Sequence, residues 1–304
     1  MSNQNKAYLF AGLSILCWSS ISTAFKISLK HLTPIGLLFI ASLVATSFLG
    51  LSLVITCQVK LFKQESPKAF LKNFKQSLLS GLLNPFLYYL MLFEAYSKLR
   101  AQEAQALNYT WAIVLSMFSI ILLKERFRII DLFSLLLSFV GVVFISTKGH
   151  LGTLHFDNLN ASLLALSTSI IWALYWIISI KDTRPALLKL FFNFLVGFLL
   201  ISIYIVVLQA KLLIPGTKLI TALCGGFYVG IFEMGLTFLL WLKALEYTEN
   251  TANISNLIFL TPFISLLFIA QLLHESIHTA TIWGLCLIVL SNFIQKGFFR
   301  HSKR

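Results

Sequence analysis

The stretch Gly226–Glu275, GFYVGIFEMGLTFLLWLKALEYTENTANISNLIFLTPFISLLFIAQLLHE, decides the fold because its pattern occurs twice in the chain. It begins with a helix that carries small residues four positions apart, continues past a carboxylate in an apolar run and reaches a short polar break. A second apolar helix and an acidic turn follow. Its marker residues are Gly226, Gly230, Glu233, Ala244, the pair Thr261-Pro262 and Glu275.

The first copy of this pattern lies in the N-terminal half. Its marker residues are Ser77, Gly81, Asn84, Ala95, the pair Trp111-Ala112 and Glu125. Ser77 precedes Gly226 by 149 residues and Glu125 precedes Glu275 by 150, so one residue has been inserted between the markers. Each copy is followed by one more apolar helix, which ends near Thr147 or Gly297. A repeat of this length indicates duplicated halves, which are typical of membrane transporters.

The composition indicates that the chain is embedded in a membrane. Of its 304 residues, 58% are hydrophobic and 12% are charged, with a mean hydropathy of +0.86. A soluble domain has roughly a quarter of its residues charged. The apolar residues come in runs of about 20, the length that a helix needs to cross a bilayer. We therefore predict an all-α integral membrane protein.

The net charge of +13 is explained by how the basic residues are distributed across a membrane. We therefore expect no nucleic-acid partner. If the N-terminus is cytoplasmic, most basic residues fall on the cytoplasmic side, as the positive-inside rule requires. Both termini are then expected in the cytoplasm. The basic residues left outside are Lys26, Lys30, Lys98, Arg100, Lys148, Lys211 and Lys218.

The apolar runs predict ten transmembrane helices, five in each half. Because five is odd, the second half must start on the opposite side of the membrane, so we expect two inverted five-helix repeats. Residues 7–147 form the first repeat, 148–160 the linker and 161–297 the second. The expected helices are Ala7–Phe25, Pro34–Cys57, Gln76–Tyr96, Ala104–Leu123, Ile129–Thr147, Ala161–Ile180, Ala186–Leu208, Thr217–Leu242, Thr251–Leu273 and Thr279–Lys296.

We expect neither a metal ion nor a cofactor. The linker contains His150 and His155, but two loop histidines without a further Cys, His or carboxylate pattern are typical of a solvated surface. The four cysteines lie within apolar runs and show no paired or metal-type spacing.

Several short motifs of the chain resemble those of one known family. They are Trp18-Ser19-Ser20 before Lys26, Ala95-Tyr96, Ala244-Leu245-x-Tyr247, Thr261-Pro262 before Glu275, and Trp111-Ala112 before Glu125. Together with the ten helices in two halves, they resemble the EamA-type branch of the drug/metabolite transporter superfamily. The resemblance covers nearly the whole chain.

The resemblance implies a bacterial inner-membrane carrier of a small metabolite that works by alternating access. Its cavity would be lined by the first, third, fourth, sixth, eighth and ninth helices. The string Asn108-Tyr109-Thr110-Trp111 is similar to the aromatic amino acid exporters of the family. Two features depart from the family pattern: Pro34–Cys57 has no basic residue, and Ala112 stands where a proline is usual.

Glu233 is the main candidate for a functional residue. It lies within an apolar run, ten residues before Lys243 and fifteen after Lys218, which places it near mid-membrane. An ionisable group there costs several kcal/mol and suggests function, although a protonated structural glutamate remains the alternative. Glu94 is also within a run, but an ion pair with Lys98 four residues later explains it.

Further candidates follow from helical spacing and from the aromatic residues. Thr237 and Trp241 follow Glu233 at intervals of four, and Asn84 and Tyr88 occupy the matching places on the third helix. The predicted substrate-binding or coupling set is Glu233, Asn84, Tyr88, Thr237, Trp241, Trp18, Asn108, Trp172, Trp176 and Asn256.

Three function classes remain open at this point. A secondary carrier of an amino acid or an amino-acid or nucleoside derivative, including one of the S-adenosylmethionine type, fits the duplicated halves best. A membrane-embedded enzyme should show clustered His, Asp or Glu, and the chain has no HExxH motif and no Gly-rich phosphate loop. A structural membrane protein would not need polar midplane positions. We therefore expect a non-enzymatic monomer whose partners are a small substrate and the lipid bilayer.

Overall fold

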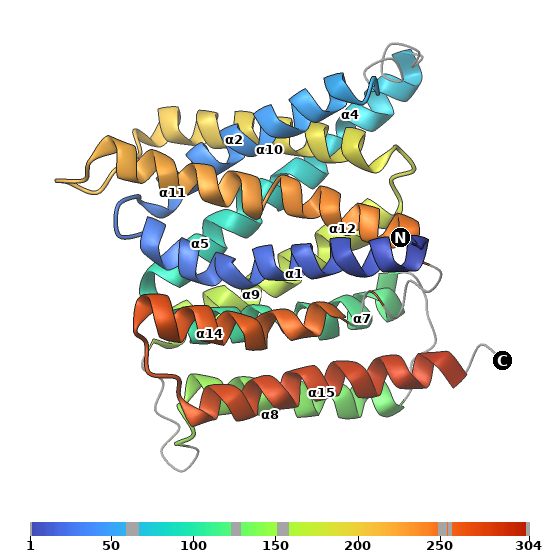
Figure 1. Ribbon diagram of the computed structural model, residues 1–304, viewed down its shortest axis with the longest axis vertical. Coiled ribbons are helices and arrows are strands. Elements are labelled where there is room, and N and C mark those ends of the chain that lie inside the picture. The colour runs from blue at the N-terminus through green and yellow to red at the C-terminus, as the bar shows by residue number, and fades with distance from the viewer. Residues whose placement is uncertain are drawn as a thin grey trace.

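The structure is a computed structural model that describes residues 2–58, 67–122, 129–150, 158–248, 254 and 257–301. These residues are almost entirely helical, and the helices lie roughly parallel or antiparallel to one another (Figure 1). Both chain termini lie at the same end of the bundle in this view.

The elements follow the order of the expected helices. In the first half they are α1 (Asn3–Ser28), α2 (Pro34–Ile55), α4 (Pro67–Gly81), the π-helix η1 (Leu82–Leu87), α5 (Tyr88–Lys98), α6 (Ala101–Asn108), α7 (Trp111–Leu122) and α8 (Ile129–Ser146). In the second half they are α9 (Leu159–Ile180), α10 (Ala186–Leu208), α11 (Leu219–Phe232), α12 (Leu236–Tyr247), the 3₁₀-helix η2 (Ile258–Leu260), α14 (Thr261–Leu273) and α15 (Thr279–His301).

The described residues contain enough apolar helix for a multi-pass membrane protein. Seven helical segments are long and apolar enough to cross a membrane, and three shorter apolar helices accompany them. The predicted all-α membrane fold is therefore confirmed. The structure does not test where the two repeats begin and end, so the boundaries at residues 147 and 161 remain predictions.

Three of the expected helices are interrupted, and the ninth contains a 3₁₀ turn. The third breaks at Asn84, whose backbone is extended (φ −142°, ψ 118°), and continues from Pro85. The fourth breaks between Asn108 and Trp111. The eighth breaks between Phe232 and Leu236. In the ninth, η2 leads into α14, where Pro262 lies in the first turn. A proline is tolerated there because the first turn has no intrahelical partner for its N–H.

The two sequence halves pack as interleaved partners. α8 packs against α15, α2 packs against α10 and α11, and α1 packs against α12 and α14. The α8–α15 pair forms one edge of the bundle and the α2–α10 pair the opposite edge (Figure 1). The core between them thus contains side chains from both halves.

The small residues of the repeated pattern lie at close helix contacts. A Cβ atom added at Gly230 would lie 2.7 Å from the main-chain oxygen of Ala41 on α2, and one at Gly81 would lie 2.5 Å from that of Asn193 on α10. Both glycines are buried. The backbones can approach this closely only because the side chains are absent.

We predict that Gly230→Leu or Gly81→Leu lowers the yield of folded protein. Overpacking a tight contact typically costs about 1–3 kcal/mol, and here the clash is with rigid backbone. Size-exclusion chromatography of detergent-solubilised protein measures the monodisperse fraction. Gly12→Leu is the matched control, because no atom lies within 4 Å of its added Cβ. Equal profiles for all three variants would contradict the packing role.

Candidate functional site

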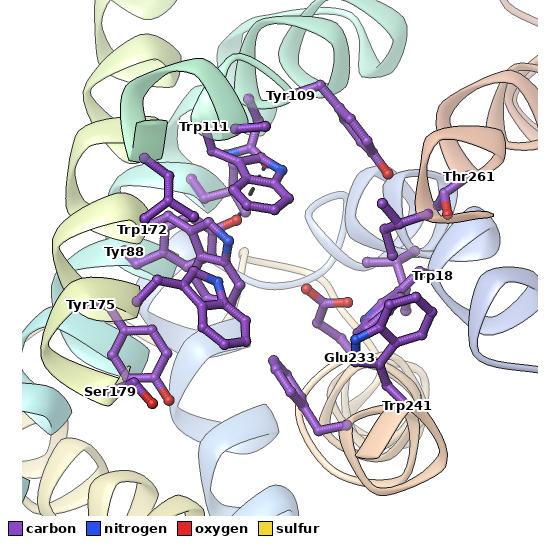
Figure 2. A pocket seen from close by; sticks show the side chains of 18 of the residues that line it. Trp18, Tyr88, Tyr109, Trp111, Trp172, Tyr175, Ser179, Glu233, Trp241 and Thr261 are labelled. Atoms are coloured by element: carbon purple, nitrogen blue, oxygen red, sulfur yellow. Dashed lines mark hydrogen bonds between the residues drawn. The ribbon is translucent and has the colours of Figure 1, made fainter. Parts of the chain in front are cut away.

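A central cavity of about 510 Å³ lies where the interrupted helices meet. This volume is in the range of small-molecule sites, roughly 300–1,000 Å³. Its lining comes from α1, α5, α6, α7, α9, α12, η2 and α14, as expected, and also from the start of α10. Figure 2 shows that aromatic side chains make up much of its wall.

Glu233 lies at the break between α11 and α12, and its carboxylate points into this cavity (Figure 2). The Tyr89 hydroxyl donates a hydrogen bond of 2.9 Å to Oε1 of Glu233. Tyr89 is fully buried, so this contact is shielded from solvent. In the part of the chain that the structure describes, no Lys or Arg side chain forms an ion pair with Glu233.

Aromatic rings form two walls on either side of Glu233. On one side, the ring of Tyr88 stacks on Trp172 at 4.6 Å between centroids, and Trp176 meets Trp172 edge-on at 6.0 Å. On the other side, Trp18 lies 5.5 Å from Trp241. Figure 2 shows the Glu233 carboxylate in the space between these two walls. We call the first group the Trp172 wall (Tyr88, Trp172, Tyr175, Trp176) and the second the Trp18 wall (Trp18, Phe238, Trp241).

Asn108 joins the cavity to its supporting helix α9. Its Oδ1 accepts a hydrogen bond of 3.3 Å from the Tyr88 hydroxyl, and its Nδ2 donates to the Thr168 hydroxyl at 2.8 Å. The neighbouring Thr110 hydroxyl bonds that of Ser169 at 2.9 Å. These bonds hold the α6–α7 break against α9 and orient the Tyr88 ring.

Seven of the ten residues predicted from sequence line the cavity. They are Trp18, Tyr88, Asn108, Trp172, Trp176, Glu233 and Trp241. Asn256 lies outside the described residues. Whether any of them binds a substrate stays a prediction.

The placement of Asn84 and Thr237 in the cavity was wrong. Both side chains are 0% exposed, and neither lines the cavity. The Thr237 hydroxyl donates to the main-chain oxygen of Phe232, and Asn84 lies near the Tyr175 hydroxyl. The prediction rested on helical spacing, in which residues four apart share a face. Asn84 lies at one break and Thr237 just after the other, whereas Tyr88 and Trp241, one turn further on, line the cavity.

The structure adds lining residues that sequence reasoning missed. The main ones are Tyr96, Tyr109, Trp111, Tyr175 and Lys189. Tyr109 and Trp111 flank the α6–α7 break, and the Tyr109 hydroxyl points toward Thr261 (Figure 2). Lys189 carried only a topological signal in the sequence. Its ammonium group donates to the main-chain oxygens of Ser179 at 3.1 Å and Asp182 at 3.4 Å.

The α9–α10 turn beside Lys189 contains a buried ion pair. Arg184 Nη2 lies 2.7 Å from Asp182 Oδ2 and donates to the Ser77 hydroxyl on α4 at 2.8 Å. Burial opposes ionisation of Asp182, but the hydrogen bonds and charge of Arg184 outweigh it and hold the pKa of Asp182 below its ordinary value. The pair therefore ties the two halves together at the end of the bundle where α1 begins.

A polar network closes the opposite end of the bundle. The carboxylate of Glu275 accepts hydrogen bonds from the main-chain N–H of Ala101, at the start of α6, and from Gln102 Nε2. Gln102 also donates to the main-chain oxygen of Ser276 at 3.0 Å and accepts from the main-chain N–H of His278 at 2.9 Å. The α14–α15 connection that holds these residues lies away from both chain termini (Figure 1).

Lys26 adds a second closure at this end. Its ammonium donates to the main-chain oxygens of Tyr96 at 2.9 Å and Leu99 at 2.8 Å. From here the cavity lining extends to Lys189 and Leu245, near the end of α12. These hydrogen bonds thus lie at the end of the bundle opposite Lys189 and Leu245.

An all-helical fold with membrane-length segments around a central cavity defines a multi-pass membrane protein. The model of the EamA-like transporter family matches residues 5–147 and 159–294, so the chain belongs to this family. The predicted resemblance is confirmed, and membership in this family points to a transporter rather than an enzyme.

Two curated relatives and one solved structure are similar over nearly the full chain. An uncharacterized transporter of Clostridium kluyveri is 22% identical and covers 95% of this chain and 92% of its own. The uncharacterized transporter YvbV of Bacillus subtilis is 25% identical and covers 95% and 90%. A crystal structure with a TM-score of 0.65 and 19% identity covers 99% of both chains and shares the fold.

We predict that Gln102→Ala loosens the closed end. The substitution removes three hydrogen bonds, each worth about 0.5–1.5 kcal/mol. A cysteine placed at the lining position Ala112 reports the opening. Its modification by a membrane-impermeant thiol reagent, added from the side away from the termini, should become about tenfold faster.

Gln271→Ala is the matched control for this experiment, because Gln271 is an exposed glutamine near the same end of α14. It should leave the modification rate unchanged. An unchanged rate in Gln102→Ala as well would show that the network does not restrict access.

Proposed function

We propose that the protein is a secondary active transporter that moves a small metabolite across the bacterial inner membrane by alternating access. The proposed substrates are amino acids, amino-acid derivatives or nucleoside derivatives. The observation that carries this proposal is Glu233, a carboxylate at a helix break that lines a central cavity, with hydrogen bonds between the two halves at one end of the bundle. Interrupted membrane helices around a midplane site are typical of secondary transporters.

Glu233 provides a group whose charge can depend on the conformational state. An ionised carboxylate at mid-membrane needs a cation, water or a bound ligand. Tyr89 supplies one hydrogen bond but no charge. When the cavity is closed to water, the protonated form is favoured, and when one side opens, hydration permits ionisation. Such a cycle couples a proton or a cationic substrate to alternating access.

Other titratable groups face the same region. The charge of Glu233 acts on Tyr88, Tyr89 and Tyr96 of α5 and on Tyr109, Lys189 lines the cavity from α10, and Cys17 of α1 lies near Thr237. Tyrosine and lysine ordinarily titrate near pH 10. Glu233 is therefore the group proposed to respond between pH 5 and 8.

The proposed orientation places both termini in the cytoplasm, as the distribution of basic residues suggests. The network of Gln102 and Glu275 then lies at the external face, and the cavity extends toward the cytoplasm. The inverted relation of the two halves belongs to the same proposal. An inverted pair can exchange which end is closed, since each half then supplies the equivalent contacts at the opposite face.

We predict that Glu233→Gln abolishes the pH dependence of transport while the protein still folds. A glutamine keeps the shape and can accept the Tyr89 hydrogen bond, but it cannot titrate. Initial uptake into proteoliposomes, measured against external pH between 5 and 8, should vary about tenfold or more in the wild type and stay flat in the variant.

Two control variants belong to this measurement. Glu94→Gln removes a carboxylate whose ion pair with Lys98 (2.7 Å) lies at the surface, as the sequence predicted, and Cys17→Ser removes the thiol of α1. Both should keep the wild-type profile. An unchanged profile and rate in Glu233→Gln would reduce Glu233 to a structural hydrogen-bonding residue.

We predict that two introduced cysteines differ in their accessibility to an impermeant thiol reagent, because they lie on opposite sides of the membrane. In a background without the four native cysteines, Lys72→Cys should react with an impermeant thiol reagent only after permeabilisation of whole cells. Asn160→Cys should react without it. Both positions are exposed, so access depends only on the side of the membrane. Labelling of Lys72→Cys in intact cells would overturn the proposed orientation.

A further inference from the structure

The Glu233 carboxylate has unused hydrogen-bonding capacity toward the cavity. A carboxylate offers about four acceptor positions, and the Tyr89 hydroxyl occupies one at 2.9 Å. Figure 2 shows the carboxylate directed toward the space between the two aromatic walls. In the described part of the chain no basic side chain pairs with it. A ligand in this space therefore meets a negative group with free acceptor positions.

Lys189 does not balance this charge. Among the described lining residues it is the only Lys or Arg, and it lies on α10 at the far end of the cavity. Its ammonium group is already directed to the main-chain oxygens of Ser179 and Asp182. The centre of the cavity thus contains an acidic group, and no basic group of the described lining lies close to it.

The aromatic walls provide a second, independent feature that favours a cation. The faces of Trp and Tyr rings carry negative potential and attract cations within about 6 Å of their centroids. Trp172, stacked on Tyr88, and Trp18, packed against Trp241, lie on opposite sides of the carboxylate (Figure 2). Ligand-binding cages for ammonium groups use this combination of rings. The walls also offer an apolar surface to the body of a ligand.

We infer that the substrate of this cavity is an organic cation whose charged nitrogen binds Glu233 and whose apolar body lies between the Trp172 and Trp18 walls. This inference rests on the proposed transport function and adds the chemical class of the substrate. An anion of the same size would be repelled by the carboxylate. A neutral molecule would leave the carboxylate unpaired in a largely apolar space.

Three probes of nearly equal size test the inference: 2-phenylethylammonium, 2-phenylethanol and 3-phenylpropanoate. They share a phenyl ring and a short chain and differ in charge. Isothermal titration calorimetry measures their equilibrium binding to the full-length protein in lipid nanodiscs at neutral pH. The ammonium probe should bind at least about tenfold more tightly than the alcohol, and the carboxylate more weakly than both.

The variants assign the preference to Glu233. Glu233→Gln should bring the affinity for the ammonium probe down to that for the alcohol and leave the alcohol affinity nearly unchanged. Glu94→Gln is the matched control, because it removes one carboxylate outside the cavity and should preserve the preference. Tyr89→Phe keeps the carboxylate and should also preserve the preference for the ammonium probe. This variant provides a second measurement if Glu233→Gln does not fold.

Equal binding of the ammonium and alcohol probes, or tighter binding of the carboxylate, would overturn the inference. No detectable binding of the ammonium probe at millimolar concentration would do the same. Exchange of a radiolabelled probe across proteoliposome membranes separates this result from the proposed function. Exchange of a neutral or anionic probe would retain the transporter and reject the cation, whereas Glu233-dependent binding without exchange would retain the cation site and reject transport.

Discussion

An interrupted helix cannot face hydrocarbon, because its freed N–H and C=O groups would find no hydrogen-bonding partner there. This constraint organises the molecule. The breaks at Asn84, Tyr109 and Glu233 border the cavity or the core beside it, and the 3₁₀ turn before α14 contributes Ile258 to the cavity lining. Continuous helices such as α2, α8 and α10 can occupy the outer edges, since all their backbone groups are paired within the segment.

The same breaks explain why Asn84 and Glu233 differ in role although they occupy matching positions in the repeat. Asn84 is enclosed by protein near Tyr175, whereas Glu233 opens into the cavity. A carboxylate is costly in either place, but only a cavity offers water or a ligand to satisfy it. The duplicated pattern therefore provides two broken helices, and only one of the two breaks carries a carboxylate.

Contacts between the halves give the cavity its two unlike ends. At one end Glu275 accepts the free N–H at the start of α6, and Gln102 bonds three groups of the α14–α15 connection. At the other end Arg184 joins the α9–α10 turn to Ser77 on α4. Because each of these contacts crosses between halves, movement of one half against the other must break or remake them.

The amino-acid sequence by itself determined the membrane fold, since apolar runs of fixed length leave the helix as the available structure. It also singled out Glu233, because a lone carboxylate in such a run is conspicuous, and it explained Glu94 by the nearby Lys98. Only the tertiary structure decided which polar residues share the cavity. Helical spacing predicted Thr237 and Asn84 in the cavity, but packing buries both beside the helix breaks. Tyr89 and Lys189 entered the account only through packing, because the sequence does not state which residues from distant helices meet.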